Sequence, residues 1–290
     1  RPPRSTLFPY TTLFRSGRTV IGNKSASGTE ILDELAEEEI ATGHMIVYTS
    51  ADSVLQICGN EETFGLEELY RCCEIAREIT MKEEWRVGRV IARPYVGKKK
   101  GEFVRTSNRH DFSLMPPRDT MLDHLRRAGK ETIGVGKIYD IFAGKGISRF
   151  TRTKDNADGM EQAIALAGED FEGLCFVNLV DFDMVYGHRN NVDGYAAAAT
   201  AFDRDLARLM GKLREGDVVI LTADHGCDPS TPSTDHSREY TPMVIFGDRI
   251  KAGVNLGTRP TFADIAATVL DYLGAQGETD GTSFLPQVLR

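Results

Sequence analysis

The chain has 290 residues, which is long enough for one large α/β domain or for two smaller domains. Its formal net charge of -8 argues against a nucleic-acid partner, and an anionic substrate would therefore need a locally basic pocket. Five cysteines without a CxxC pair favour reduced thiols in the cytoplasm over a disulfide framework, and no apolar run reaches the length of a membrane-spanning helix.

The first sixteen residues differ from the rest of the chain. Residues 1–16 (RPPRSTLFPYTTLFRS) contain no acidic residue and show neither helical nor strand periodicity. We interpret them as a non-native leader joined to a truncated reading frame, with a natural basic arm as the alternative. The segment is therefore left out of the fold prediction.

Residues 17–114 have a regular pattern. Ser27 and Glu30 have the spacing of a capping box, which predicts that a helix starts there. Further along, the pattern predicts strands at 45–48 and 87–92, a helix at 66–80 and a polar loop at 105–111. The run Met115-Pro116-Pro117 breaks the pattern, and we place a domain boundary there.

Strands and helices alternate in residues 115–290. The predicted helices cover 121–128, 159–167, 195–213 and 261–273, and the predicted strands cover 132–135, 174–180, 218–221 and 243–246. Alternation of this kind indicates an α/β fold with a mainly parallel sheet and helices on both faces. Because residues 218–221 (VVIL) are uniformly apolar, we expect them to form a buried parallel strand.

Carboxylates and imidazoles follow two of these strands. Asp183 and His188 come after the strand at 174–180, and Asp224 and His225 come after the strand at 218–221. His236 follows across a loop rich in proline, serine and threonine, which can fold back towards the first pair. Open α/β sheets place their chemistry at the carboxyl ends of strands.

These five side chains suit a metal site. Three imidazoles with two carboxylates favour borderline divalent ions such as manganese, zinc or iron. Two ions about 3.5–4 Å apart can stabilise both the entering and the leaving oxygen of a phosphoryl transfer. We predict such a two-metal centre, although five ligands are too few to fill both sites. Strand alternation puts Asp181 on the same side as Asp183 but further back, and we assign it a supporting role.

The same residues carry a resemblance to a known family. The motif TADHG at 222–226 with a later histidine is typical of the alkaline phosphatase superfamily. The longer segments 222–242 (TADHGCDPSTPSTDHSREYTP) and 178–189 (NLVDFDMVYGHR) resemble the prokaryotic phosphopentomutases of that superfamily. Shorter stretches agree, and the resemblance extends from residue 17 to the end; the stretches are 20–31, 47–57, 89–97, 104–111, 134–140 and 256–264.

The resemblance implies a fold and a ligand assignment. An alkaline-phosphatase-like core would comprise 115–290, and 17–114 would be a smaller α+β cap over the active site. Asp183, His188 and His236 would bind one metal, and Asp224 and His225 would contribute to the other. In the family an aspartate and a nucleophilic threonine ahead of the cap complete the second site. Neither is recognisable in residues 1–16, so we expect an N-terminally truncated chain with little or no activity and no catalytic nucleophile of its own.

The resemblance also implies a reaction and its participants. Phosphopentomutases interconvert (deoxy)ribose 1-phosphate and (deoxy)ribose 5-phosphate in nucleoside salvage, through a phosphothreonine enzyme and two divalent ions, here expected to be Mn²⁺. Activation by a sugar bisphosphate and a cytoplasmic monomer are expected as well.

Substrate recognition is assigned to a small set of polar residues. Ser50 and Asp52 are candidates for the sugar hydroxyls, with turn capping as the alternative. Arg105 is the preferred phosphate clamp because a guanidinium matches phosphate oxygens. The remaining candidates are Arg93, Arg109 and Lys137.

Two rival functions stay open. One is another enzyme of the superfamily, either a metal-dependent phosphatase or a cofactor-independent phosphoglycerate mutase. The other is a non-catalytic domain that uses the cluster as a structural metal site. Structural zinc sites are often rich in thiolates, and Cys227 is the thiol beside the cluster in the sequence.

Overall fold

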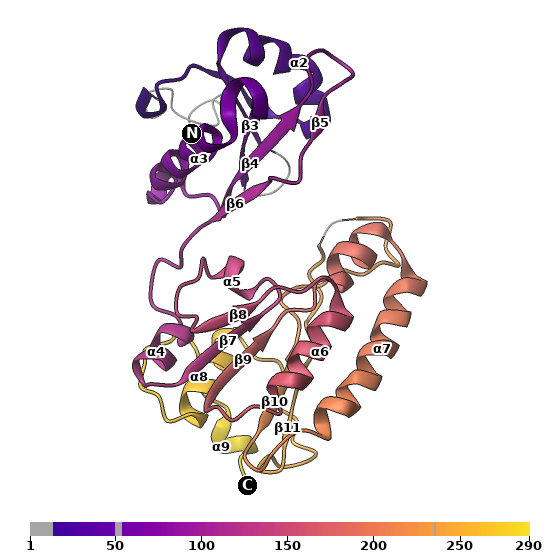
Figure 1. The fold of residues 1–290 in the computed structure, drawn as a ribbon. Helices are drawn as coiled ribbons and strands as arrows, with labels where there is room; N and C mark the ends of the chain where they lie inside the picture. Colours follow the sequence, from indigo (N-terminus) through magenta and orange to yellow (C-terminus); the bar gives the residue numbers. More distant parts are fainter. Residues whose placement is uncertain (1–13, 50–53, 235) are drawn as a thin grey trace. The chain divides into compact units, whose positions relative to one another are not determined.

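The computed structural model describes residues 14–49, 54–234 and 236–290 (Figure 1). The chain divides into two compact units, 1–115 and 116–290. Within the described ranges, no helix is both long enough and apolar enough to pass through a bilayer.

The first unit is built on one mixed sheet with the strand order β1-β2-β3-β4-β5, to which β6 adds by pairing with β4. Its strands are β1 (Val20–Ser25), β2 (Met45–Thr49), β3 (Val54–Asn60), β4 (Arg89–Val96), β5 (Val104–Arg105) and β6 (His110–Ser113). The β1–β2 and β3–β4 pairs are parallel, and the β2–β3, β4–β5 and β4–β6 pairs are antiparallel.

Helices cover both faces of this sheet. The helical segments are η1 (Phe14–Ser16), α2 (Gly28–Thr42), η2 (Glu61–Gly65), α3 (Leu66–Ile79) and η3 (Glu83–Trp85). Met45 and Val47 of β2 pack in the cluster that includes α3, whereas Ile46 and Tyr48 pack in the cluster that includes α2. Successive residues of a strand point to opposite faces, so a strand covered on both sides loses its polar alternation.

The predicted cap of α2 is confirmed, because the Ser27 hydroxyl accepts a hydrogen bond from the Glu30 amide at 3.3 Å. Strand β3 was missed, although it is buried along its whole length. Its polar residues Gln56 and Asn60 interrupt the apolar pattern that would predict a buried strand. Both can be buried because each has a hydrogen-bond partner inside the unit. The segment at 105–111 was expected to be a loop, yet β6 begins within it at His110.

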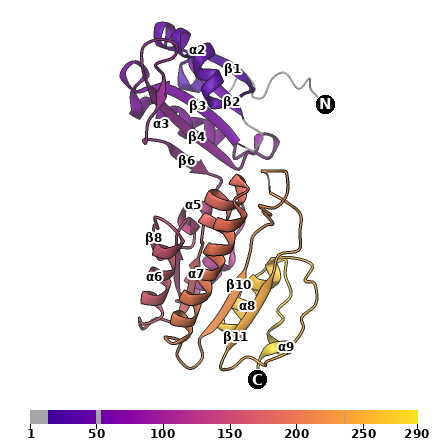
Figure 2. The same ribbon diagram turned by 90° about the vertical axis from the view of Figure 1, so that its right-hand side faces the viewer.

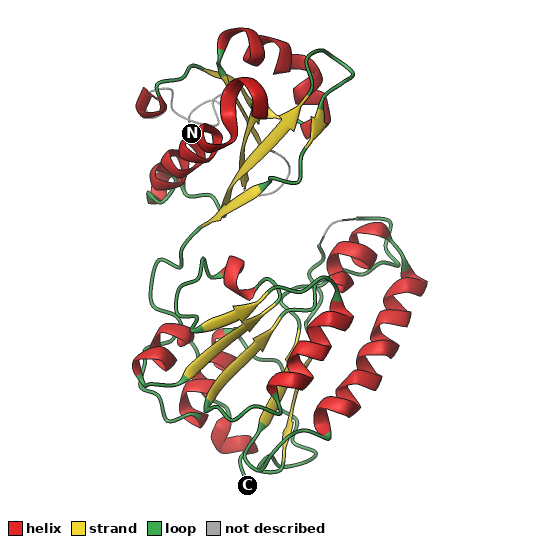
Figure 3. Ribbon diagram, viewed as in Figure 1, coloured by secondary structure: helices red, strands yellow, loops and turns green. Residues whose placement is uncertain are grey.

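The second unit contains two sheets (Figure 3). In the first, β7 (Glu131–Val135) pairs in parallel with β8 (Arg149–Thr151) and with β9 (Gly173–Val177). In the second, β10 (Val218–Thr222) pairs with β11 (Met243–Gly247). The helical segments are α4 (Met121–Arg127), α5 (Ile138–Ile141), α6 (Asn156–Leu166), η4 (Phe182–Tyr186), η5 (Gly187–Arg189), α7 (Val192–Met210), α8 (Ala263–Tyr272) and α9 (Leu285–Val288).

The α/β class and the mainly parallel pairing are confirmed, but two details of the second unit were predicted wrongly. Strand β10 runs antiparallel to β11 and is half-buried, not a buried parallel strand. Parallel neighbours usually need a helical crossover, and the described residues between these strands, 223–234 and 236–242, contain no helix. In addition, β9 ends at Val177, three residues earlier than the predicted strand at 174–180.

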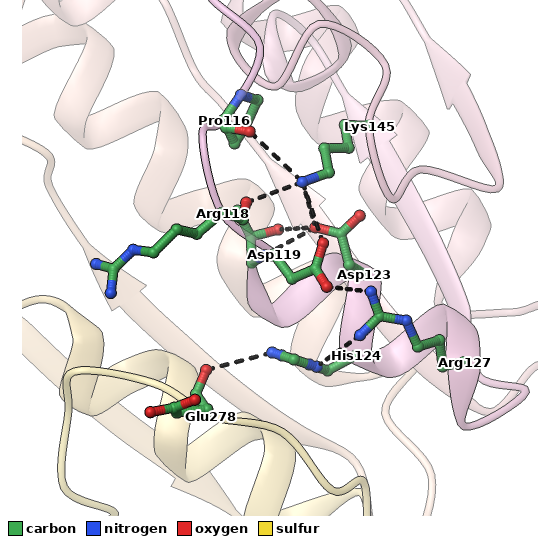
Figure 4. A network of polar contacts seen from close by, with 9 residues as sticks. Pro116, Arg118, Asp119, Asp123, His124, Arg127, Lys145 and Glu278 are labelled. Atoms are coloured by element: carbon green, nitrogen blue, oxygen red, sulfur yellow. Dashed lines mark hydrogen bonds and ion pairs between the residues drawn. The ribbon is translucent and has the colours of Figure 1, made fainter. Parts of the chain in front are cut away.

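A polar network fixes the start of the second unit (Figure 4). Lys145 Nζ donates to the Arg118 carbonyl at 2.9 Å and pairs with Asp119 at 3.2 Å. Arg127 pairs with the same Asp119 carboxylate. These contacts anchor α4 and the chain that leads into it, so the second unit begins as an ordered segment directly after the proline pair.

Helices α6 and α7 lie side by side (Figures 1 and 2). The guanidinium of Arg208 on α7 holds the carboxylate of Glu161 on α6 through contacts of 2.5 and 3.0 Å. Asn156, the first residue of α6, is hydrogen-bonded to Asp181 just ahead of η4, and α7 begins shortly after η5; the predicted metal ligands Asp183 and His188 lie in η4 and η5. This helical pair therefore supports the segment that carries the site.

Candidate metal centre

Asp183 lies in the π-helical turn η4, which follows β9 after a short connection. The connection is held by a reciprocal pair of hydrogen bonds: the Asn156 amide donates to the Asp181 carboxylate at 2.8 Å, and the Asp181 amide donates to Asn156 Oδ1 at 2.9 Å. The strand alternation used to place Asp181 was therefore wrong, because the strand has already ended. Its carboxylate anchors the turn to the start of α6 and leaves Asp183 to face the site.

His188 is oriented by a carbonyl from the loop on the other side of the site. Its Nδ1–H donates to the Thr234 carbonyl at 2.5 Å. That bond sets the tautomer, so Nε2 keeps its lone pair and lies 3.3 Å from Asp183 Oδ1. A carbonyl that fixes one ring nitrogen while the other faces a ligand cluster is the usual arrangement of a metal-binding histidine.

The loop that carries His236 is folded back by hydrogen bonds to the backbone. Gly226 and Ser237 form an isolated antiparallel bridge, with the Ser237 amide donating to the Gly226 carbonyl at 2.9 Å. Asn190 Nδ2 contacts three loop carbonyls, those of Pro229, Thr231 and Ser233, at 3.4, 2.5 and 3.1 Å. The loop thus folds back as predicted, and the Gly226–Ser237 bridge and the Asn190 amide hold it in that position.

The three imidazoles form a stack. The ring centroids of His225 and His236 are 3.7 Å apart, and those of His188 and His236 are 4.8 Å apart. His236 Nε2 lies 3.1 Å from Asp183 Oδ1. His225 Nδ1 lies 3.2 Å from the Gly226 carbonyl, which leaves its Nε2 as the nitrogen available to a ligand. The structure thus brings together four of the five predicted ligands.

Asp224, the fifth predicted ligand, lies at the margin of the cluster. Its Oδ2 is 3.5 Å from His225 Nε2, and its side chain is 76% exposed. Asp224 and His225 also line a cavity of about 900 Å³, together with Lys251, Asn255 and Arg259. This carboxylate is therefore accessible from the cavity.

The ligand atoms fall into two groups of three that share Asp183. In one group Asp183, His225 and His236 have their ligand atoms within 4.8 Å of one another, and in the other Asp183, His188 and Cys227 do. Imidazole nitrogens with a carboxylate suit borderline divalent ions. The donor set of the described residues therefore fits the predicted metals in chemistry and in spacing.

Cys227 lies next to Asp183. Burial raises the pKa of the Cys227 thiol, and the Asp183 carboxylate, which accepts a hydrogen bond from the thiol, raises it further. The sulfur also lies against Gly187, where a β-carbon would come within 2.5 Å of Sγ. The sequence pointed to Cys227 only as part of a rival structural metal site.

In the first unit, two of the predicted phosphate-binding residues share one polar cluster. Arg93 Nε donates to Gln56 Oε1 at 2.8 Å, and Arg105 donates to the Tyr48 hydroxyl at 3.1 Å. The Tyr48 hydroxyl in turn donates to Gln56 Oε1 at 3.1 Å, and burial raises the pKa of Tyr48 to about 12. Tyr48 and Gln56 escaped the sequence prediction, because an aromatic and an amide in apolar strands resemble core residues.

The electrostatics of this cluster favour an anion. Burial lowers the pKa of Arg93, and the nearby guanidiniums of Arg109 and Arg105 lower it further. Among the described residues, no carboxylate lies within ion-pair distance of Arg93 or Arg105. The Arg105 guanidinium also occupies the space beside Gly28, the first residue of α2, where the helix dipole is positive.

The remaining predicted substrate residues lie elsewhere. Arg109 is engaged by both oxygens of Asp111, at 2.7 and 2.8 Å. Lys137 belongs to the second unit, where its Nζ lies 2.6 Å from Met184 Sδ, beside Asp183 in the turn η4. Ser50 and Asp52 lie outside the described residues.

Known proteins similar to this chain point to one family. The model of the metalloenzyme superfamily matches residues 21–277. A protein named phosphopentomutase from Agathobacter rectalis is 62% identical over 90% of this chain and 66% of its own length. Phosphopentomutases from Lachnoclostridium phytofermentans and Clostridium perfringens are 55% and 58% identical, over 95% and 90% of this chain.

The chain spans 66–70% of the length of these relatives. The predicted resemblance is confirmed over the range in which the site residues of both units lie. By the match to the family model and by its identity to these curated relatives, the chain belongs to the phosphopentomutase family of the metalloenzyme superfamily.

Proposed function

We propose that this chain provides the cap and most of the metal centre of a phosphopentomutase, which interconverts (deoxy)ribose 1-phosphate and (deoxy)ribose 5-phosphate. One observation carries the proposal. In a chain 55–62% identical to phosphopentomutases, Asp183, His188, His225 and His236 converge from separate segments.

In this proposal Asp183, His188 and His236 hold one divalent ion, and Asp224 and His225 contribute to the other, with Mn²⁺ as the expected ion. Bound ions of this kind neutralise the charge that builds up on a transferring phosphoryl group. The protein's own part is orientation. The hydrogen bond from His188 Nδ1 to the Thr234 carbonyl orients His188 Nε2 towards the proposed ion, and the Gly226–Ser237 bridge holds the backbone next to His236.

Recognition of the substrate phosphate is assigned to Arg93 and Arg105. Two guanidiniums without a carboxylate partner among the described residues repel each other, and Arg105 also faces the positive end of α2. A phosphate bound there would relieve both repulsions and accept bidentate hydrogen bonds from a guanidinium. Arg109 is a weaker candidate because Asp111 already pairs with it.

The other recognition residues complete the proposal. Lys137, next to the turn that carries Asp183, would offer a positive charge to the phosphoryl group in the second unit. Ser50 and Asp52 are proposed to bind the sugar hydroxyls. A mutase must also keep water from its phosphoenzyme, and residues 17–114 are proposed to act as the cap that does so.

The phosphothreonine nucleophile and the activation by a sugar bisphosphate belong to the proposed cycle, but we assign the nucleophile to no residue of this chain. We therefore expect the chain alone to have little mutase activity. Its expected cytoplasmic location and monomeric state also stay predictions.

The test is an assay of two proteins with Mn²⁺ and a sugar bisphosphate activator. One is this chain, and the other joins residues 17–290 to the N-terminal segment of the Agathobacter rectalis relative. The joined protein should convert ribose 1-phosphate to ribose 5-phosphate, and the chain alone should not. Turnover of phosphoglycerate only, or simple release of phosphate, would favour the rival enzymes.

A metal analysis addresses the non-catalytic rival. The proposal expects two divalent ions in the joined protein, with an assay rate that depends on both. A closed structural site would instead retain one tightly held ion and support no turnover with any phosphate ester. Either result decides between the two functions.

A further inference from the structure

The second ligand group contains a sulfur atom that the proposed metal centre does not use. The ligand atoms of Asp183, His188 and Cys227 all lie within 4.8 Å of one another, and all three residues are half-buried. Of the other four cysteines, Cys58, Cys72 and Cys73 are buried in the first unit, and Cys175 is in β9. Cys227 is therefore the thiol positioned to share an ion with Asp183 and His188.

One separation in this group is that of a tetrahedral site. Ligands that lie about 2.0–2.1 Å from a zinc ion are separated by about 3.3 Å in a tetrahedron. His188 Nε2 and Asp183 Oδ1 are 3.3 Å apart. His188 Nδ1 is held by the Thr234 carbonyl, so its Nε2 is the nitrogen turned towards the group. Two of three ligand atoms are thus already at the spacing of one coordination shell.

The third ligand atom, Cys227 Sγ, lies beside a glycine that leaves room for it. Cys227 Sγ lies against Gly187, and a β-carbon at that position would come within 2.5 Å of the sulfur. A glycine at this point of η5, next to His188, therefore lets the thiol approach the other two ligands. The Gly226–Ser237 bridge, which begins one residue before Cys227, fixes the backbone from which the thiol projects.

We propose that Asp183, His188 and Cys227 form a sulfur-containing site for a thiophilic divalent ion such as Zn²⁺. When the sulfur–metal bond forms, the thiol loses its proton to solvent, so one proton is released for each ion bound. Thiolate ligands favour zinc, whereas Mn²⁺ prefers oxygen and nitrogen. A zinc ion at this site takes two side chains that the proposed Mn²⁺ centre also uses, so the two ions compete.

The inference goes beyond the proposed function and does not rest on it. Sugar phosphates and the mutase reaction play no part in the assignment of Cys227. What the two share is Asp183 and His188, and the closing experiment therefore reads out the sulfur–metal bond directly, without a substrate.

The experiment replaces zinc by Co²⁺ in the whole chain and records its absorption spectrum. The wild-type protein should show a near-ultraviolet sulfur-to-cobalt charge-transfer band. Cys227→Ser should lose that band, and the matched control Cys175→Ser should keep it. Zn²⁺ affinity, measured by competition with a chelator, should fall at least about 10-fold in Cys227→Ser, while Mn²⁺ affinity measured by electron paramagnetic resonance should not change.

A second measurement uses only the wild-type chain and so does not depend on how the variants fold. Iodoacetamide followed by peptide mass spectrometry should label Cys227 without metal and leave it unlabelled with Zn²⁺. A band that survives Cys227→Ser, or zinc binding that leaves Cys227 open to alkylation, would overturn the proposal. An intact band together with no mutase activity in the joined protein, which carries the N-terminal segment of the Agathobacter rectalis relative, would instead count against the proposed function alone.

Discussion

The two units bury their apolar strands to different extents. All seven residues of β3 in the first unit are buried, between α2 on one face and α3 on the other. In the second unit β9 and β10 contain fewer polar residues than β3 but are at most half-buried, and α7 has no buried residue. The first unit is thus held by its core, whereas the segments that carry the candidate metal ligands are held to a large extent by polar contacts.

The lower burial in the second unit coincides with the location of the candidate metal centre. Ions and substrates must reach the ligand side chains, so those side chains cannot be enclosed in a close-packed core. The site segments instead depend on specific hydrogen bonds, such as those of Asp181, Asn190 and His188. Polar substitutions should therefore damage the second unit most, and apolar truncations should damage the first.

The largest expected effect comes from Asp183, because its carboxylate belongs to both ligand groups. Asp183→Asn should weaken binding of both ions by at least about 100-fold, measured as metal content after dialysis against a chelator. Asp203→Asn is the control, since that exposed carboxylate on α7 belongs to neither ligand group. Equal metal content in wild type and Asp183→Asn would contradict the ligand assignment.

The comparison of cores can be tested with one isoleucine from each unit. Ile57 of β3 is fully buried and Ile220 of β10 is half-buried, so Ile57→Ala should lower the free energy of unfolding by about 2–5 kcal/mol and Ile220→Ala by about 1 kcal/mol. Trp85, the single tryptophan, reports on urea unfolding of the first unit, and hydrogen exchange reports on both. A larger loss at Ile220 would mean that β10 belongs to a tighter core than its exposure indicates.

A smaller effect is expected at the arginine cluster of the first unit. In Gly28→Ala the new methyl group collides with the Arg105 guanidinium and must displace it. Affinity for ribose 5-phosphate should fall about 10-fold, or about 1.4 kcal/mol, by isothermal titration.

Two controls accompany the substitution at Gly28. Gly211→Ala adds the same methyl group where the nearest atom is 3.5 Å away, and it should bind like wild type. If Gly28→Ala acts through Arg105, it should have little further effect in an Arg105→Ala background. Additive losses would show that the two residues act independently.

The smallest predicted effect concerns pH and the first unit. Burial raises the pKa of Glu39 above its ordinary value of 4.5, although hydrogen bonds from Tyr95 and the Asn60 amide oppose this. A raised folded-state pKa means that stability from the protonated form is fully present below about pH 4.5 and is lost as the pH rises through the folded value.

Glu39→Gln removes that titration and keeps a carbonyl oxygen for the two donors. Unfolding followed by Trp85 fluorescence should therefore depend less on pH in the variant, which gains relative to wild type as the pH rises from 4 to 7. A parallel pH dependence in both proteins would show that Glu39 does not cause the loss. Hydrogen exchange in the second unit should be the same in both.

Sequence reasoning located the longer helices and about half of the strands in the described residues, because their apolar periodicity is strong. It also named the four candidate ligands that converge, because they lie in the segments that follow two strands and in a loop that returns to those segments. It missed β3, because Gln56 and Asn60 find partners only in the folded unit. It predicted β10 to be a parallel strand, whereas β10 is antiparallel to β11. An apolar run indicates that a strand is buried but not whether its neighbour runs parallel or antiparallel.

The supporting residues of the site were harder to predict. Asp181 was placed by strand alternation, which no longer applies once the chain enters a turn. Nothing in the sequence pattern predicted the role of Asn190. Its left-handed backbone conformation (φ 50°) is one that asparagine tolerates well. Such residues act on backbone carbonyls far away in the chain, and residue type alone does not reveal that.

The amide of Asn190 has a consequence for how this chain tolerates change. Surface loops usually accept extra or missing residues at little cost. Here the Asn190 side chain contacts the carbonyls of Pro229, Thr231 and Ser233. The loop must then bring the His236 imidazole back to the Asp183 carboxylate. The length of this loop is therefore constrained, and a single inserted residue would move the His236 imidazole away from Asp183.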